Sequence, residues 1–125
     1  MEKIYNTYKP SGFHTVSSYL FVHNPEESID FLKKLFFAIE INRTINPKNN
    51  DIANCILQIG DTCFMISQAS GKFKNMKTAL YLYVDNVDNM HNQAVAYGAT
   101  AEFEPKDMPY DDRQSGIIDH SGNYW

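Results

Sequence analysis

Histidine side chains can hold a metal ion, and the spacing of the histidines in this chain decides whether they do. The histidines stand far apart, and no two of them are four residues apart, as a metal pair on one helix face requires. Two lie at expected strand or turn ends and one in the middle of an expected helix. We therefore expect scattered surface residues: His14, His23, His91 and His120.

A run of acidic residues ahead of an arginine is a second candidate for chemistry. Asp107, Asp111 and Asp112 precede Arg113 in the chain. Paired carboxylates could transfer protons if they converged on a pocket, but we expect a solvated acidic loop over 105–112. Arg113 could bind a substrate carboxylate or hold Asp119 or Asp112 in place, and the structural role is favoured.

Aromatic residues at alternate positions form the third candidate. Tyr19 and Phe21 share one face of an expected strand, and Tyr81 and Tyr83 share the same face of another. A phenol ring is apolar in its body and polar at its tip, so such a face suits a small-molecule pocket. The same rings could equally fill an ordinary core or a dimer contact, and the pattern leaves both readings open.

These aromatic residues belong to a pattern that occurs twice. Tyr19–Asn24 recurs as Tyr81–Asn86, 62 residues later (81 − 19), about half of the 125-residue chain. A repeat of this length predicts two similar modules rather than a solenoid, which needs at least three units. We expect one domain over 1–125, with module one at about 14–68 and module two at about 78–125.

Each module should contain a strand, a helix and then further strands. In module one we expect a strand over 14–22, a helix beginning at Asn24 and Pro25, a strand over 39–44 and a hairpin of strands 52–59 and 62–68. In module two we expect a strand over 78–85, a helix over 86–97 with Val87, Met90, Ala94 and Val95 inward, and strands over 100–104 and 114–119. The repeat places an eighth strand near 124–130, so it should be missing or cut to two residues, with a frayed or partner-completed edge.

Composition and cysteine placement limit the class of protein. A turn at Gly60 pairs Gln58 with Cys63 and places Cys55 opposite Ile66, so the two sulfurs face opposite sides and should stay free. Free thiols and the absence of a signal-peptide pattern fit a cytoplasmic protein. The formal net charge is −4, which argues against nucleic acid or an anionic membrane as a partner.

Two copies of strand, helix and three strands resemble the vicinal oxygen chelate superfamily, which includes glyoxalase I, bleomycin-resistance proteins and extradiol dioxygenases. The nearest resemblance is to its demethylubiquinone-methyltransferase-like branch, and it implies an α+β fold of two βαβββ modules around a cup. Phe37 and Asp111 stand where such proteins usually carry glycine; aspartate tolerates a left-handed backbone. The resemblance spans about 16–125 and is carried by Tyr19–Val22, Ile29–Leu32, Leu57–Asp61, Leu82–Asp88, Tyr97–Thr100, Tyr110–Arg113 and Asp119–Trp125.

The resemblance also implies where a metal would be held. Metal enzymes of the superfamily place a His, Gln or Glu ligand on the first, fourth, fifth and eighth strands. The first three positions fall at or near Ser17, Met65 and Ala79 in this chain, and the last falls past Trp125. Asn54 stands where similar proteins often carry a histidine, and an amide oxygen is a poor transition-metal ligand. We expect no metal and no cofactor.

Together these observations predict a metal-free homodimeric protein that binds a small, partly aromatic molecule in the cup. Two alternatives stay open. One is a small-molecule enzyme of lyase, dioxygenase or transferase type that uses Arg113 and a cup tyrosine, and the other is a structural domain whose own side chains fill the cup. The candidate ligand-binding residues are Ser17, Tyr19, Phe21, Asn54, Gln58, Met65, Tyr81, Tyr83 and Arg113.

Overall fold

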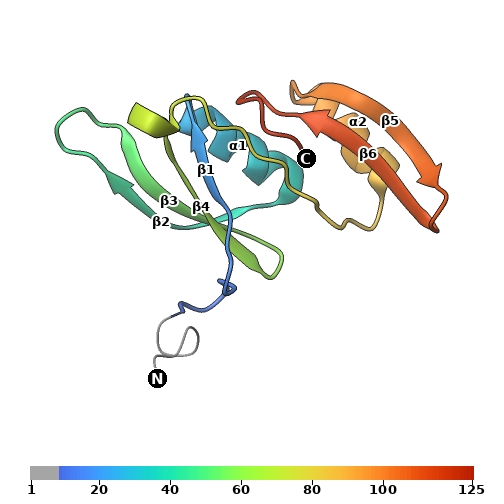
Figure 1. The fold of residues 1–125 in the computed structure, drawn as a ribbon, viewed down its shortest axis with the longest axis horizontal. Coiled ribbons are helices and arrows are strands. Elements are labelled where there is room, and N and C mark those ends of the chain that lie inside the picture. Colours follow the sequence, from blue (N-terminus) through green and yellow to red (C-terminus); the bar gives the residue numbers. More distant parts are fainter. Residues whose placement is uncertain (1–8) are drawn as a thin grey trace.

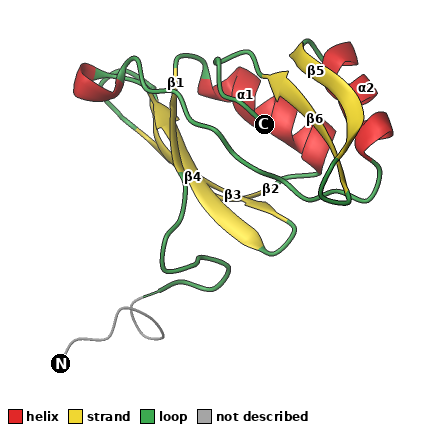
Figure 2. Ribbon diagram, turned by 45° about the vertical axis from the view of Figure 1, so that its right-hand side comes forward, coloured by secondary structure: helices red, strands yellow, loops and turns green. Residues whose placement is uncertain are grey.

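The computed structural model describes residues 9–125, and it forms a mixed α+β fold with two halves (Figure 1). In the first half, helix α1 lies against one face of a four-stranded sheet. In the second half, a β-hairpin packs on helix α2, and α1 lies on the side of the sheet that faces this half (Figure 2). No helix in the described part of the chain is long and apolar enough to cross a membrane. In chain order the elements are β1 (Tyr19–Val22), α1 (Pro25–Phe36), β2 (Ile39–Ile45), β3 (Ile52–Ile59), β4 (Thr62–Gln68), the 3₁₀ helix η2 (Gly71–Phe73), α2 (Val87–Ala96), β5 (Thr100–Met108) and β6 (Asp112–Ile118).

Helix α1 begins and ends where its local sequence dictates. The Asn24 side chain accepts a hydrogen bond from the backbone N–H of Glu27, and Pro25 occupies the first turn, where its missing N–H is harmless. Phe37 ends the helix in a left-handed conformation with φ of 57°, and its side chain is left in solvent. The apolar stripe of the helix is buried against the sheet: Ile29, Leu32, Leu35 and Phe36.

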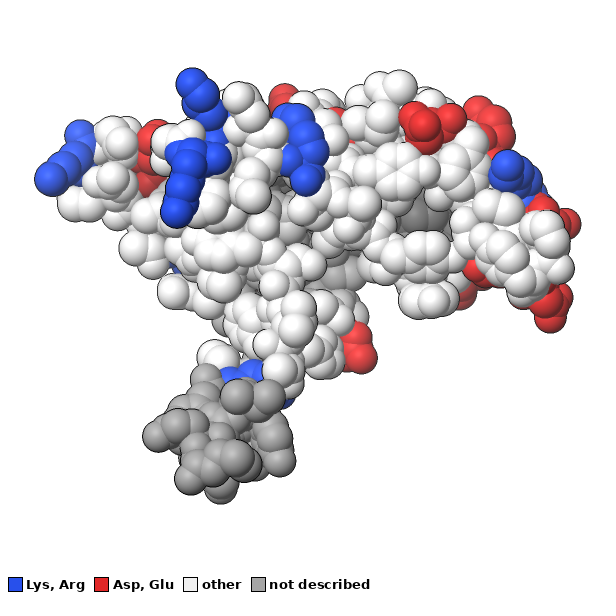
Figure 3. Space-filling model, in the orientation of Figure 1, with Lys and Arg blue, Asp and Glu red and all other residues white. Residues whose placement is uncertain are grey.

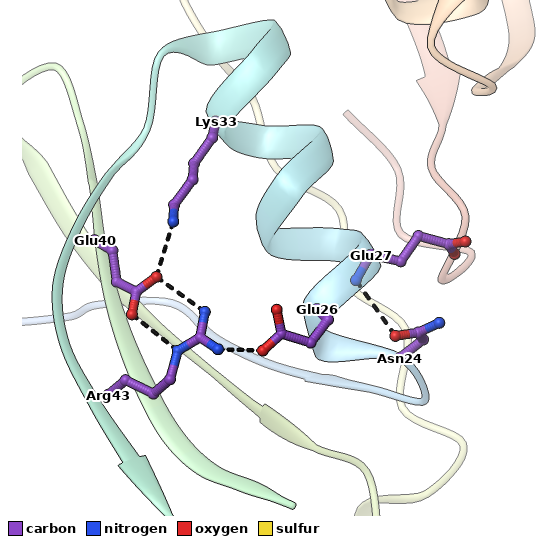
Figure 4. Close-up of polar contacts among 6 residues, drawn as sticks. All are labelled: Asn24, Glu26, Glu27, Lys33, Glu40 and Arg43. Carbon is purple, nitrogen blue, oxygen red and sulfur yellow. Dashed lines mark hydrogen bonds and ion pairs between the residues drawn. The ribbon is translucent and has the colours of Figure 1, made fainter.

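An ionic cluster joins α1 to β2 (Figure 4). The Glu40 carboxylate accepts hydrogen bonds from Lys33 Nζ at 2.9 Å and from Arg43 Nε and Nη2 at 2.8 and 2.9 Å. Arg43 also contacts Glu26 at the start of the helix. Because these donors surround one carboxylate, the pKa of Glu40 is lowered, first by Arg43 and then by Lys33.

The four-stranded sheet has the order β1-β4-β3-β2, with β1 parallel to β4. The predicted hairpin is confirmed, since Gln58 lies opposite Cys63 and Cys55 opposite Ile66. Both cysteines are free and buried, as expected. The helix-facing side of the sheet forms the main core and includes Leu20, Val22, Cys55, Leu57, Phe64 and Ile66.

Strand β1 is shorter than predicted. The sequence predicts a strand from His14, but β1 begins at Tyr19. The Ser17 hydroxyl accepts a hydrogen bond from the His14 N–H and donates one to the His14 carbonyl. This local turn competes with strand pairing, as serine side chains commonly do.

The predicted strand over 78–85 is wrong for most of its length. Only Ala79 forms a bridge, parallel to Tyr124, which also bridges Ile118 in the antiparallel sense. Tyr124 and Trp125 thus lie where β4 lies in the other sheet, between a parallel and an antiparallel neighbour. Past Leu80, the extended segment 79–84 has no partner strand within residues 9–125, which explains why its alternating sequence does not form a ladder.

The acidic loop predicted over 105–112 is also wrong. Strand β5 runs on through Pro105 to Met108, and β6 starts at Asp112, so the connecting turn is short. A register shift lies between Phe103 and Lys106, which accommodates the proline on this outer strand. Asp111 has a φ of 59°, the left-handed conformation that the sequence allows there.

Helix α2 is capped as predicted, but the face that it buries differs from the predicted one. The Asn86 side chain accepts a hydrogen bond from the Asn89 N–H, and Gly98 follows the helix with a φ of 105°. Val95, predicted to face inward, is 43% exposed. His91, predicted to lie on the surface, is only 3% exposed. Helix α2 packs on β5 and β6 through the face that carries His91 and Ala94, and Val95 lies at the edge of that face.

Candidate functional site

Three aromatic rings stack on the side of the four-stranded sheet that α1 does not cover. Tyr19 and Phe21 of β1 lie 4.5 Å apart between ring centroids, at 6° between planes. Phe73 of η2 continues the stack, 4.3 Å from Phe21 at 8°. Phe73 is not predicted from the sequence, because it lies in a polar connector with no periodic signal.

Polar side chains surround the Tyr19 hydroxyl. It lies 2.8 Å from Ser67 Oγ and accepts a hydrogen bond from Asn54 Nδ2 at 3.2 Å. The same Asn54 amide contacts Met65 Sδ at 3.3 Å. Four predicted residues, namely Tyr19, Phe21, Asn54 and Met65, therefore lie together, but their rings and polar groups already satisfy one another.

Two other predicted residues of the first half point elsewhere. Ser17 is engaged by the His14 backbone. Gln58 donates a hydrogen bond from Nε2 to the Gly60 carbonyl, at the tip of its own hairpin. Neither side chain joins the group around Tyr19.

A second aromatic group lies in the other half. The rings of Tyr81 and Tyr83 are 5.3 Å apart, and the Tyr81 hydroxyl donates a hydrogen bond to Asp112 Oδ2 at 2.8 Å. Gln114 Nε2 donates to Asp112 Oδ2, the Tyr81 hydroxyl and the Tyr110 hydroxyl. The hydrogen bond to Asp112, followed by desolvation, raises the pKa of Tyr81 to about 12. Among residues 9–125, no hydrogen bond or ring contact joins this group to the stack on β1, so the predicted aromatic residues form two separate groups.

Arg113 has a structural role, though not with the partners that the sequence suggests. Its guanidinium donates to both oxygens of Asp88 at 2.8 Å and to Asp107 at 3.0 Å. The hydrogen bond to Asp88, followed by the one to Asp107, raises the pKa of Arg113. The hydrogen bond from Arg113 lowers the pKa of Asp88. Arg113 thereby fastens β6 to the start of α2 and to β5, and its charge is matched there.

A cavity of about 170 Å³ opens between the segment 79–84, β6 and α2. In the space-filling view a hollow lies over this half among uncharged side chains, with acidic residues along the outer rim (Figure 3). Tyr81, Tyr83, Arg113 and Gln114 belong to its lining, so three predicted site residues meet here. Its apolar lining includes Leu80, Leu82, Met90, Ala94, Phe103 and Trp125.

His91 is the polar residue deepest in this lining. Its Nε2 lies 3.1 Å from Glu104 Oε2, within ion-pair distance, although no hydrogen bond is formed there. Neither ring nitrogen has a hydrogen-bond partner in the described part of the chain. The sequence holds a signal for the burial of His91. It lies four residues after Val87 and three before Ala94, and this spacing places all three on one face of the helix.

The sequence itself decides the family. The family model of the Glyoxalase/Bleomycin resistance protein/Dioxygenase superfamily matches residues 12–125. The chain belongs to this superfamily. No curated protein sequence matches it.

Solved structures with the glyoxalase-superfamily fold are similar to this chain over most of its length. TioX from Micromonospora sp. ML1 is 20% identical, with a TM-score of 0.67, over 88% of this chain and 90% of that one. A putative 3-demethylubiquinone-9 3-methyltransferase, PhnB protein, from Bacillus cereus is 12% identical, with a TM-score of 0.63, over 90% and 96%. Fosfomycin resistance protein FosX from Mesorhizobium loti is 16% identical, with a TM-score of 0.62, over 87% and 85%. At these identities the likeness shows the fold alone.

The three residues that the resemblance assigns to metal positions carry no nitrogen or carboxylate ligand. Ser17 is turned onto the backbone, Met65 offers a thioether, and Ala79 offers no donor. Across residues 9–125, no group of three or more His, Cys, Asp or Glu side chains is arranged to hold an ion. Divalent metals with open positions for a substrate need such nitrogen or oxygen ligands.

Proposed function

We propose that this member of the glyoxalase superfamily binds a small, partly aromatic molecule without a metal ion, in the cavity of the second half. The observation that carries the proposal is the cavity itself. It combines a mainly apolar lining with a few polar groups, among them Gln114 and the Tyr81 hydroxyl. That combination is typical of small-molecule sites.

The size of the cavity narrows the ligand. Drug-sized ligands occupy pockets of roughly 300 Å³ or more, whereas a cavity of about 150 Å³ accepts a single benzene ring. The cavity of about 170 Å³ therefore suits one aromatic ring with a small substituent. Tyr83, which is 85% exposed, is free to cover such a ring from outside.

The first half supports a ligand less well. Phe21 is already stacked on both sides, by Tyr19 and Phe73, and the Tyr19 hydroxyl is already hydrogen-bonded. The enzyme alternative also loses its main residue, because Arg113 is held by two aspartates and has its charge matched.

A homodimer remains part of the proposal. Strand β2 forms one edge of the four-stranded sheet and exposes Ile39 by 60%, Ile41 by 53% and Ile45 by 42%. Edge strands with exposed apolar side chains pair readily with another chain. Size-exclusion chromatography with light scattering should give a molar mass twice that of one chain. The variant Ile41→Lys should lower it to the mass of a single chain.

Thermal unfolding with a panel of single-ring aromatics in EDTA tests the binding proposal. A ligand at one hundred times its Kd should stabilise the protein by about 2.7 kcal/mol. Ala94→Leu, which narrows the cavity, should remove the effect, while Tyr19→Ala should retain it. Stabilisation that requires Ni²⁺, Zn²⁺ or Mn²⁺, or that is lost with Tyr19→Ala and kept with Ala94→Leu, would contradict the proposal.

A further inference from the structure

His91 is a buried imidazole whose hydrogen-bonding capacity is unused. The side chain is 3% exposed and lines the cavity, and neither Nδ1 nor Nε2 has a hydrogen-bond partner in the described residues. Buried polar groups are nearly always hydrogen-bonded, so an unpaired one beside a cavity calls for an explanation. A ligand in that cavity supplies one.

The surroundings of His91 restrict which polar group can approach it. The Glu104 carboxylate lies 3.1 Å from Nε2, so a second carboxylate at the imidazole would meet like charge. Arg113 gives no help to an anion, because Asp88 and Asp107 already match its charge. The ligand group at His91 should therefore be uncharged.

The remaining lining is apolar and fits a ring. Leu82, Met90, Ala94 and Phe103 lie around the cavity, and its 170 Å³ holds one six-membered ring. A plain hydrocarbon would fill this space but leave both nitrogens of His91 unpaired. A hydroxyl group both donates and accepts, so it suits either tautomer of the imidazole.

We propose that the cavity selects single-ring phenols, with the phenol hydroxyl hydrogen-bonded to the His91 imidazole and the ring between Leu82 and Met90. This inference rests on the proposed function, since it names the ligand class for the same cavity. His91 acts as the residue that determines specificity, and Tyr81 and Tyr83 only border the opening.

Three probes of similar size test the selection: phenol, fluorobenzene and benzoate. Fluorobenzene matches phenol in shape but cannot donate a hydrogen bond, and benzoate carries the excluded charge. Titration of the full chain by calorimetry or NMR should give a Kd for phenol about tenfold lower than for fluorobenzene, the ratio expected for one net hydrogen bond. Benzoate should bind more weakly than either.

The variant His91→Leu should make phenol and fluorobenzene bind equally, while His120→Leu, at an exposed histidine, should keep the tenfold preference. If His91→Leu does not fold, ring ¹⁵N shifts of the wild-type protein serve instead. Phenol should move the His91 ring nitrogens, and fluorobenzene should leave them in place.

The outcomes separate this inference from the proposed function. Equal affinity for phenol and fluorobenzene in the wild-type protein, with His91 unmoved, overturns the selection of phenols and leaves small-aromatic binding intact. Failure of all three probes to bind overturns both.

Discussion

The Trp125 indole nitrogen donates a hydrogen bond of 2.8 Å to the Asp119 carboxylate. The other oxygen of that carboxylate accepts from the backbone N–H groups of Ser121 and Asn123. Trp125 is 9% exposed, and its ring lies 5.1 Å from that of Phe36. One aspartate thus shapes the turn after β6 and places an indole that lines the cavity and packs with the core of the first half.

Replacing Asp119 should therefore destabilise the protein strongly. Asp119→Ala leaves two backbone donors and the indole N–H without their acceptor, and we expect a loss of about 2–3 kcal/mol in the free energy of unfolding. Urea denaturation followed by Trp125 fluorescence measures it. Asp30→Ala, at an exposed position of α1, should change stability by less than about 0.5 kcal/mol. Equal small effects would show that the Asp119 turn is dispensable.

The backbone of the segment 79–84 should exchange its amide hydrogens rapidly. Leu80 N–H is bonded to the Tyr124 carbonyl, but Leu82 and Val84 N–H have no backbone acceptor in the described residues. Hydrogen exchange by NMR should show low protection at Leu82 and Val84 and high protection at Leu20 and Val22, the matching positions of β1. Comparable protection in both segments would mean that a further strand pairs with 79–84.

Much of the first half can be derived from its sequence, because the signals there are local. Asn24 and Pro25 fix the start of α1, and the Gly60 turn fixes which residues of β3 and β4 lie opposite each other. The second half was harder, since a strand needs a neighbour as well as an alternating pattern. The segment 79–84 has the better alternation of the two copies, yet it lacks a partner past Leu80.

The candidate site was predicted only in part for a related reason. Tyr19 contacts Phe21 and Tyr81 contacts Tyr83, as their places on one strand face suggest, but the separation of the two pairs depends on how the halves pack. The lack of a second histidine at metal spacing predicts a surface position for His91, although its helical spacing places it on the buried face of α2. The cavity itself is formed by residues from several separate segments, and no single pattern marks it.

The hydrogen bond between Tyr81 and Asp112 should be visible in a titration. The Asp112 carboxylate raises the pKa of Tyr81 to about 12, and Asp112→Asn should bring it back toward the ordinary value of 10. The pKa of Tyr81 is higher in the folded protein than in the unfolded chain. The hydrogen bond therefore contributes its full stabilisation below pH 10, and this contribution is lost as pH rises through 12. Titration of the Tyr81 ring carbon by NMR measures the shift, and an unchanged pKa in the variant would count against the bond.

The ionic cluster between α1 and β2 should stabilise the fold modestly and in a pH-dependent way. Glu40→Gln weakens the contacts with Lys33 and Arg43, and we expect a loss of about 1 kcal/mol at pH 7. The pKa of Glu40 is lowered from 4.5, so this contribution is present above pH 4.5 and is lost as pH falls through the lowered value. Urea denaturation at pH 7 and pH 3 should show the wild-type advantage only at pH 7. Glu102→Gln, at an exposed position of β5, is the matched control. If it lowers the free energy of unfolding as much as Glu40→Gln does, the cluster does not stabilise the fold specifically.

Metal-free binding of an aromatic ring in the second half is tested most directly by an NMR titration of the full chain with phenol in excess EDTA. We predict that the methyl and amide signals of Leu82, Met90 and Ala94 shift and saturate, while those of Phe21 and Asn54 stay in place. Shifts confined to the face around Tyr19, or shifts that appear only after Zn²⁺ or Ni²⁺ is added, would contradict the account.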